Sequence, residues 1–208
     1  MRQAPHIPNH QYALTVATSA TVEPIDIDTA KTFLRVETPD DDHLIAGFIA
    51  AARQYTANKL ARTLCTTTWR LALDDFPDGN SPIVLHNPPV TTTTTNVSIT
   101  YIDSNGNSTT LASSNYQLDG YSEPGRIYPG YGLTWPEARS QPNAVVVQYV
   151  AGYGNSVDSV PSGIRAFMLR VIAELYENRE MTVVGTISQE YPHLDGMLDP
   201  YRWSLQCG

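Results

Sequence analysis

A stretch rich in β-forming residues lies between two helical regions, and this order constrains the fold more than any other feature of the chain. The stretch spans residues 66–152, and its clearest strand pattern is Ala144–Val150, which Gly152 ends. Asn105-Gly106 is the strongest short-range signal for a hairpin turn and follows the apolar run Val97–Ile102. The sequence therefore predicts a mixed chain in which a β-rich insert interrupts a set of helices.

Helices are predicted from capping signals and apolar spacing. Asp28 and Thr29 can cap a short helix. Three aspartates after Pro39 favour a second helix start, because carboxylates are stabilised at the positive end of the helix dipole. Pro161 suits the first turn of a third helix. The expected helices span residues 28–35, 40–64 and 161–179, with a last short helix from Tyr191 to Pro200. The predicted class is α+β, a small bundle of about four helices with the β-rich insert between the second and third helices.

The composition excludes several classes of protein. Charged residues make up 16% of the 208 residues, whereas soluble chains average about 25%. Hydrophobic residues reach 41%, which is unlike a disordered chain. A net charge of −8 argues against tight nucleic-acid binding, which needs clustered basic residues. No apolar run approaches the roughly 20 residues of a membrane span, and the N-terminus lacks a signal-peptide pattern. We expect a protein made in a cytosol that makes no membrane contact.

Catalytic and metal-binding patterns are not found. The five histidines are scattered without metal-ligand spacing, and no GxSxG motif is present. The acidic loop 74–80 resembles a calcium loop, but Phe76 occupies a ligand position, so a plain acidic turn is favoured. Glu174 and Glu177 alternate with arginines at helical spacing, which is typical of a solvated or intersubunit face. Cys65 and Cys207 are expected to be reduced thiols. We expect no enzyme, no metal and no cofactor.

The uncharged surface favours contacts between proteins. Tyr outnumbers Phe by twelve to four, and the basic residues are eleven Arg and two Lys. Tyr and Arg are enriched at interface hot spots. Several tyrosines could instead cover the edges of a small sheet, and both interpretations stay open.

A series of segments resembles the siphophage-type head–tail connector proteins of tailed bacteriophages, also called adaptor or head-completion proteins. The matching segments, in order, are Ile27–Val36, Asp40–Ile45, Ala51–Tyr55, Leu85–Val90, Val97–Asp103, Pro124–Pro129, Trp135–Pro136, Val147–Gly154, Val160–Ile164, Tyr176–Glu180 and Leu198–Trp203. No single motif is decisive, but their order and spacing match the family over residues 25–203. The first 24 residues and the run Thr91–Thr95 depart from the family pattern.

The resemblance implies a structural role in the virion neck. Such proteins form a ring of about twelve copies beneath the portal, in head-to-tail contacts that close. The ring extends the DNA channel and presents a platform for stopper or tail-completion proteins. DNA would pass through without sequence-specific binding, and the acidic balance would keep its phosphates from the wall. The protein would be made in the host bacterial cytoplasm.

The implied organisation has three parts. These are an N-terminal arm (residues 1–24), an adaptor domain (25–180) and a C-terminal docking segment (181–208). The apolar residues of the docking segment could anchor on the portal as a helix does in a groove, or fold back on their own helices. The candidates for portal docking are Tyr191, Leu194, Leu198, Tyr201, Arg202 and Trp203. The candidates for contacts between subunits or with the tail side are Tyr101, Asn105, Gly106, Tyr128, Tyr131, Trp135 and Tyr153.

Two alternatives stay open at this point. The first is a stopper or tail-completion protein of the same neck. Stoppers are mostly β, so two long helices favour the adaptor. The second is a small cytosolic enzyme, which would need a polar pocket with perturbed carboxylates that the sequence does not indicate.

Overall fold

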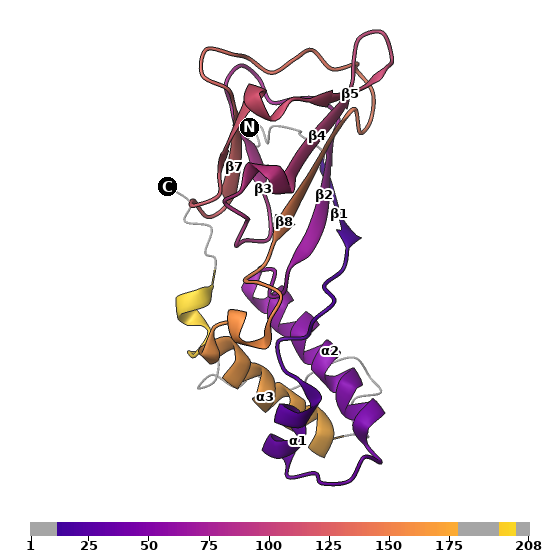
Figure 1. Cartoon of the computed structure of the whole chain (residues 1–208), viewed down its shortest axis with the longest axis vertical. Coiled ribbons are helices and arrows are strands. Elements are labelled where there is room, and N and C mark those ends of the chain that lie inside the picture. The colour runs from indigo at the N-terminus through magenta and orange to yellow at the C-terminus, as the bar shows by residue number, and fades with distance from the viewer. Residues whose placement is uncertain (1–11, 179–195, 203–208) are drawn as a thin grey trace, which may run out of the picture. The chain divides into compact units, whose positions relative to one another are not determined.

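The computed structural model describes residues 12–178 and 196–202 (Figure 1). The chain divides into two compact units. The β unit comprises residues 12–19, 67–86 and 90–151, and the described part of the helical unit comprises residues 20–66, 87–89, 152–178 and 196–202. Each unit has its own cluster of buried apolar side chains. The sequence therefore builds two separate cores.

The larger sheet of the β unit has five antiparallel strands in the order β1-β2-β8-β4-β5 (Figure 1). The strands are β1 (Tyr12–Thr18), β2 (Thr67–Leu73), β8 (Val145–Ala151), β4 (Val97–Ile102) and β5 (Ser108–Leu111). The register places one apolar residue from each strand in a single row: Leu14, Leu71, Val147, Ile99 and Leu111. Because side chains alternate along a strand, the neighbouring row faces the other side of the sheet. That row is polar and holds Thr15, Arg70, Gln148 and Ser98.

A second, three-stranded sheet covers the same core. Its strands are β3 (Ile83–Leu85), β7 (Gly125–Pro129) and β6 (Tyr116–Asp119), in the order β3-β7-β6. Buried residues from both sheets form one cluster, which includes the paired Ile83 and Ile127. The Tyr116 hydroxyl donates to the carbonyl of Val97 at 2.9 Å and so links the two sheets. The insert is therefore a two-sheet unit with a core of its own.

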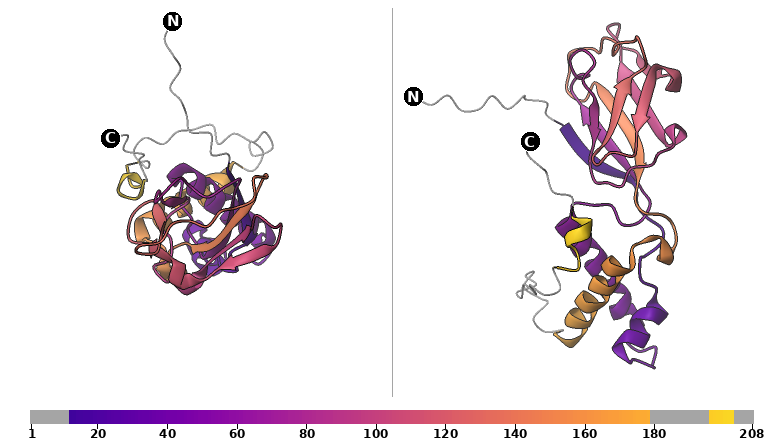
Figure 2. Two further views of the ribbon diagram at one scale, coloured as in Figure 1. Left: turned by 90° about the horizontal axis from the view of Figure 1, so that it is seen from above. Right: turned by 90° about the vertical axis from the view of Figure 1, so that its left-hand side faces the viewer.

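The helical unit consists of three helices packed on one another (Figure 2). They are α1 (Ile27–Leu34), α2 (Asp42–Leu60) and α3 (Ser162–Glu177). The buried residues follow helical spacing, as Ile45, Phe48 and Ala52 do on α2. The core also contains Leu64 and Cys65, which follow α2, and Leu198 near the C-terminus.

The helix ends differ in detail from the predicted ones. The cap of α1 is Asp26, two residues before the predicted cap, and its carboxylate accepts the N–H of Thr29 at 2.7 Å. Helix α2 ends at Leu60 and not at residue 64, because Ala61 adopts a left-handed conformation with φ of 52°.

The predicted fold class was wrong. The described residues form three α-helices and two antiparallel sheets of five and three strands, not a bundle of four helices with a smaller insert. Strand β1 was missed because residues 1–24 were interpreted as an arm, although Tyr12, Leu14 and Val16 alternate with smaller residues as in a strand. It becomes a strand by pairing with β2. The first half of the predicted fourth helix lies outside the described residues, and its described part holds the start of a short 3-10 turn, η5 (Asp199–Tyr201). The other 3-10 turns are η1 (Thr94–Asn96), η2 (Ser113–Asn115) and η3 (Val157–Ser159).

None of the helices in the described ranges is long and apolar enough to cross a membrane.

Candidate functional site

The tip of the β4–β5 hairpin is an ordered, solvent-exposed turn. The Asp103 carboxylate accepts the N–H groups of Asn105 and Asn107, each at 2.9 Å. The Asn107 N–H is the main reason why the pKa of Asp103 lies below its usual value. Gly106 has a φ of 87°, a conformation that favours glycine, and donates to the Asp103 carbonyl at 2.9 Å. Asn105 and Gly106, both predicted contact residues, are thus presented on an exposed tip whose turn is held by hydrogen bonds to Asp103.

The predicted aromatic contact residues fall into two groups. Trp135 is buried, stacks on Phe76 with 5.2 Å between ring centroids, and donates its Nε1–H to the Ser81 carbonyl at 2.9 Å. Tyr101 packs edge-to-face on Phe76 at 5.5 Å. In contrast, Tyr131 is 97% exposed. The structure therefore brings Trp135 and Tyr101 together around Phe76 in the β core and leaves Tyr131 free for a partner.

The remaining predicted tyrosines, Tyr128 and Tyr153, lie on other elements. Tyr128 is half-buried on β7. Tyr153 belongs to the helical unit, where it packs against the helical core and donates its N–H to the Leu64 carbonyl at 3.1 Å.

Tyr121 is a surface residue that was not among the predicted contact residues. It lies in the turn between β6 and β7 and is 89% exposed. Its exposure could have been predicted from the sequence Asp119-Gly120-Tyr121-Ser122, because aspartate, glycine and serine beside a tyrosine indicate a turn.

Half of the predicted docking residues can be placed. Leu198 is fully buried in the helical core. Tyr201 is half-buried and packs beside Gly163 of α3, and its carbonyl accepts the Arg62 Nε–H. Arg202 forms an ion pair with Asp199 at 3.5 Å. Leu198 and Tyr201 therefore fold back on their own unit, and Tyr191, Leu194 and Trp203 lie outside the described residues.

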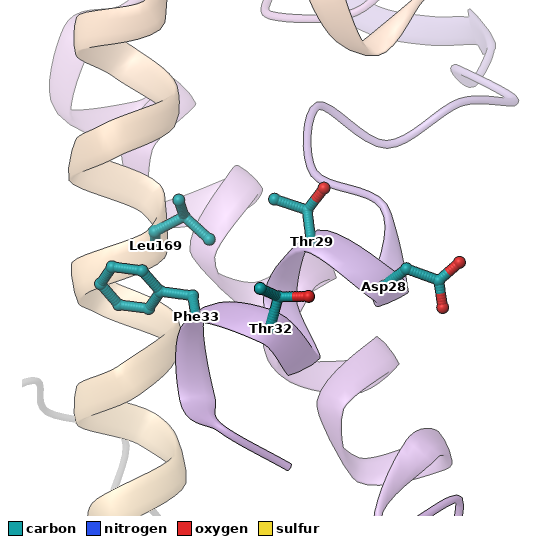
Figure 3. A pocket seen from close by; sticks show the side chains of 5 residues that line it. All are labelled: Asp28, Thr29, Thr32, Phe33 and Leu169. Carbon is teal, nitrogen blue, oxygen red and sulfur yellow. The ribbon is translucent and has the colours of Figure 1, made fainter. Parts of the chain in front are cut away.

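A shallow pocket lies between α1 and α3 (Figure 3). Its volume is about 400 Å³, and Asp28, Thr29, Thr32 and Phe33 of α1 line it with Leu169 of α3. Phe33 is 42% exposed, which makes it one of the larger apolar groups on the surface of this unit. Asp28 is the only ionisable group of the lining, so the pocket offers no acid–base pair.

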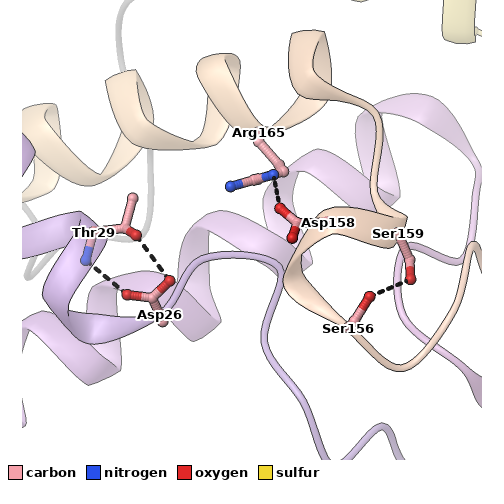
Figure 4. Close-up of polar contacts among 6 residues, drawn as sticks. All are labelled: Asp26, Thr29, Ser156, Asp158, Ser159 and Arg165. Carbon is pink, nitrogen blue, oxygen red and sulfur yellow. Dashed lines mark hydrogen bonds and ion pairs between the residues drawn. The ribbon is translucent and has the colours of Figure 1, made fainter.

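Polar contacts fix the approaches to α1 and α3 (Figure 4). The Asp26 carboxylate accepts both the N–H and the hydroxyl of Thr29, and the Thr29 N–H is the largest cause of its lowered pKa. Arg165 of α3 donates to Asp158 of η3 at 2.9 Å. The hydroxyls of Ser156 and Ser159 lie 2.7 Å apart. These polar residues therefore stabilise the segments at which α1 and α3 begin.

The groups considered for metal or nucleophilic chemistry have structural partners. Asp74 accepts the Asn143 N–H at 2.8 Å, and Asp75 accepts the Phe76 N–H at 2.7 Å. Burial raises the pKa of the Cys65 thiol to about 11, so it is protonated at neutral pH. Within residues 12–178 and 196–202, no cluster of three or more His, Cys, Asp or Glu side chains could hold a metal ion.

Residues 24–117 match the model of a protein family described as phage gp6-like head–tail connector protein. This match confirms the predicted resemblance over residues 24–117. No curated protein matches the chain.

The fold is similar to chains from gene transfer agent (GTA) particles. One is from the neck of an empty GTA particle computed with C6 symmetry, at 20% identity and a TM-score of 0.73. A second is from the virion of a native GTA particle, at 19% identity and a TM-score of 0.73. A third is from the neck of a native GTA particle computed with C12 symmetry, at 19% identity and a TM-score of 0.65. Each similarity covers 94% of this chain and 98% of the other, so the two chains share their fold over nearly their whole lengths.

Proposed function

Because residues 24–117 match the family of phage gp6-like head–tail connector proteins, we propose that the chain is a structural protein of the neck of a phage or phage-like particle. The family match carries this proposal. The matched range includes all of α1 and α2 and continues through β4 and β5, so it covers parts of both units. The similar folds of chains from GTA particles support it.

We further infer a ring of about twelve copies beneath the portal, closed by head-to-tail contacts. The neck reconstructions with C6 and C12 symmetry that contain similar folds favour such a ring. The low charge of the chain also suits it, because a ring subunit must bury two different lateral surfaces without desolvating many charges. The ring would extend the DNA channel and carry the stopper or tail-completion proteins below it.

The exposed hairpin tip and Tyr131 are the parts of the β unit that we assign to contacts with neighbouring subunits or the tail side. Both are accessible, and the tip holds its shape through the Asp103 hydrogen bonds. For the portal we retain the C-terminal segment, with Tyr191, Leu194 and Trp203 as anchors. The buried Leu198 and half-buried Tyr201 would position this segment on the helical unit.

The proposed role requires neither catalysis nor a cofactor, because a connector acts through its contact surfaces. The protein would be made in the host cytoplasm and would end in the virion neck.

The experiment that tests the role is removal of this chain from a particle-producing strain. We expect DNA-filled heads without tails in electron micrographs, and restoration of tailed particles when the wild-type chain is supplied from a plasmid. Mass spectrometry of purified wild-type particles should find the chain at about twelve copies. Tailed particles formed without the chain, or wild-type particles that lack it, would overturn the proposal.

A further inference from the structure

Strand β1 forms an open edge of the five-stranded sheet. Among the described residues, β2 is its only strand partner, so its outer backbone N–H and C=O groups face away from the sheet. Six of its seven residues are exposed and only Leu14 is half-buried. A row of unpaired backbone groups is a template for pairing with another strand.

The two edges of the three-stranded sheet are protected, whereas β1 of the five-stranded sheet is not. Natural edge strands are blunted by charged side chains, by proline or by short length. Strand β3 has three residues, and β6 has four and ends in Asp119. Strand β1 has seven residues, Tyr-Ala-Leu-Thr-Val-Ala-Thr, with no charge and no proline. A long uncharged edge of this kind on a folded protein indicates an interface.

Strand β5 forms the opposite edge of the same sheet and is the strand with which β1 of another copy could pair. Its sequence is Ser-Thr-Thr-Leu, again without charge, and Ser108 and Thr110 are exposed. The five strands form four neighbouring pairs, and every pair is antiparallel. The two outer strands, β1 and β5, therefore run in the same direction. Copies related by rotation about a ring axis can therefore continue the sheet from one subunit to the next, with β5 of one copy parallel to β1 of its neighbour.

We propose that β1 pairs with β5 of a second copy of this chain, so that the five-stranded sheets join around the ring. This inference rests on the proposed ring and names the contact that closes it. The two edges are different surfaces, which is what a head-to-tail interface requires.

The contact is small because β5 has only four residues. One short strand pair lies well below the buried area of a stable interface. The isolated chain is therefore expected to be monomeric at micromolar concentration, and the strands pair when other neck contacts hold the copies side by side.

Cysteine cross-linking in assembled particles tests the pairing. Adjacent strands bring Cα atoms to about 5 Å, within the range that a disulfide spans. Ala13, Thr15 and Thr110 all face the side of the sheet opposite the core row, so we choose Ala13→Cys or Thr15→Cys together with Thr110→Cys. The background carries Cys207→Ser, and the buried Cys65 stays.

On mild oxidation of particles, at least one double variant should give a ladder of covalent dimers, trimers and larger oligomers on a non-reducing gel. Each single variant should stay monomeric. No ladder from either double variant in assembled particles would overturn the pairing. Dimers from Thr15→Cys alone would also overturn it, because they would indicate β1 pairing with β1.

A charge variant decides the question if the cysteine variants do not assemble. Ala13→Lys with Thr15→Lys should fold with an unchanged unfolding midpoint but enter necks at least tenfold less than wild type. The matched control is Asn80→Lys with Ser81→Lys, two exposed positions in the loop between β2 and β3 of the same unit, and this variant should enter necks normally. Equal incorporation of both variants would contradict the pairing and leave the connector role intact. Absence of the wild-type chain from necks would instead contradict the connector role itself.

Discussion

The β unit and the helical unit hold their polar groups in different ways. The helical unit uses ion pairs, among them Lys31 with Asp42 at 2.7 Å and Arg53 with Glu23 at 2.8 Å. The β unit uses aromatic donors on backbone carbonyls. Tyr149, for example, donates its hydroxyl to the His86 carbonyl at 2.8 Å. The described parts of the two units are similar in length but differ in charge. The β unit has three basic and seven acidic residues, whereas the helical unit has eight basic and eleven acidic residues.

The low proportion of charged residues in the chain is therefore due mainly to the β unit. A surface with few charges is easier to desolvate on contact. We therefore propose that lateral contacts involve chiefly the β unit, where the open β1 edge and the exposed Tyr121 and Tyr131 also lie.

The largest expected effect is cavity formation in each core. Ile99→Ala in the β unit and Met168→Ala in the helical unit remove side chains with no exposed surface. Each should lower the unfolding free energy by about 2–5 kcal/mol. If the cores are independent, hydrogen exchange should accelerate mainly in the unit that carries the substitution. Equal acceleration in both units would show one cooperative core instead of two.

A similar loss of stability is expected at the C-terminal turn. Leu198→Ala should cost about 2–5 kcal/mol because Leu198 is fully buried in the helical core. Trp203→Ala is the matched comparison, and it should reduce portal binding in a pull-down while leaving the unfolding midpoint unchanged. Normal portal binding by Trp203→Ala would remove Trp203 from the docking surface.

A smaller effect is expected at the cap of α1. Asp26→Ala should destabilise the helical unit by about 1 kcal/mol through loss of the hydrogen bonds from Thr29. Since these bonds lower the pKa of Asp26 in the folded state, its contribution is complete above the unfolded-state pKa and is lost as pH falls through the folded-state pKa. Chemical denaturation at neutral and at acidic pH should show the variant and the wild type converging in acid. A difference that persists there would contradict the role of the carboxylate.

A comparably small effect is expected in the β unit from Tyr149→Phe, which removes the hydroxyl that donates to His86. The loss should be about 0.5–1.5 kcal/mol. Tyr131→Phe is the control, because its side chain is 97% exposed and should not alter stability. Chemical denaturation of the two variants measures the difference, and equal midpoints would mean that the Tyr149 bond contributes nothing.

Much of the local structure could be predicted from the sequence. The strand over Ala144–Val150 and the turn at Asn105-Gly106 were recovered as β8 and the β4–β5 hairpin, because strand propensity and turn chemistry are local properties. The three α-helices were found within a few residues of their observed ends. The resemblance to the connector family also followed from the order of short motifs, and the family model matches residues 24–117.

Features that depend on distant pairing could not be predicted. Strand β1 exists because β2 lies beside it, and nothing within residues 12–18 indicates that partner. Trp135 and Tyr131 are close in sequence and equally aromatic, yet one is buried against Phe76 and the other is solvent-exposed.

The sequence by itself determined the helices, the principal strand, the hairpin turn and the resemblance to the connector family, since these depend on neighbouring residues and on motif order. Only the tertiary structure decided that the insert is a two-sheet unit with its own core and that Leu198 is buried. It also decided that β1 is left as an open edge. Burial and edge exposure depend on which distant segments come into contact, and the sequence of a single strand or turn does not specify those contacts.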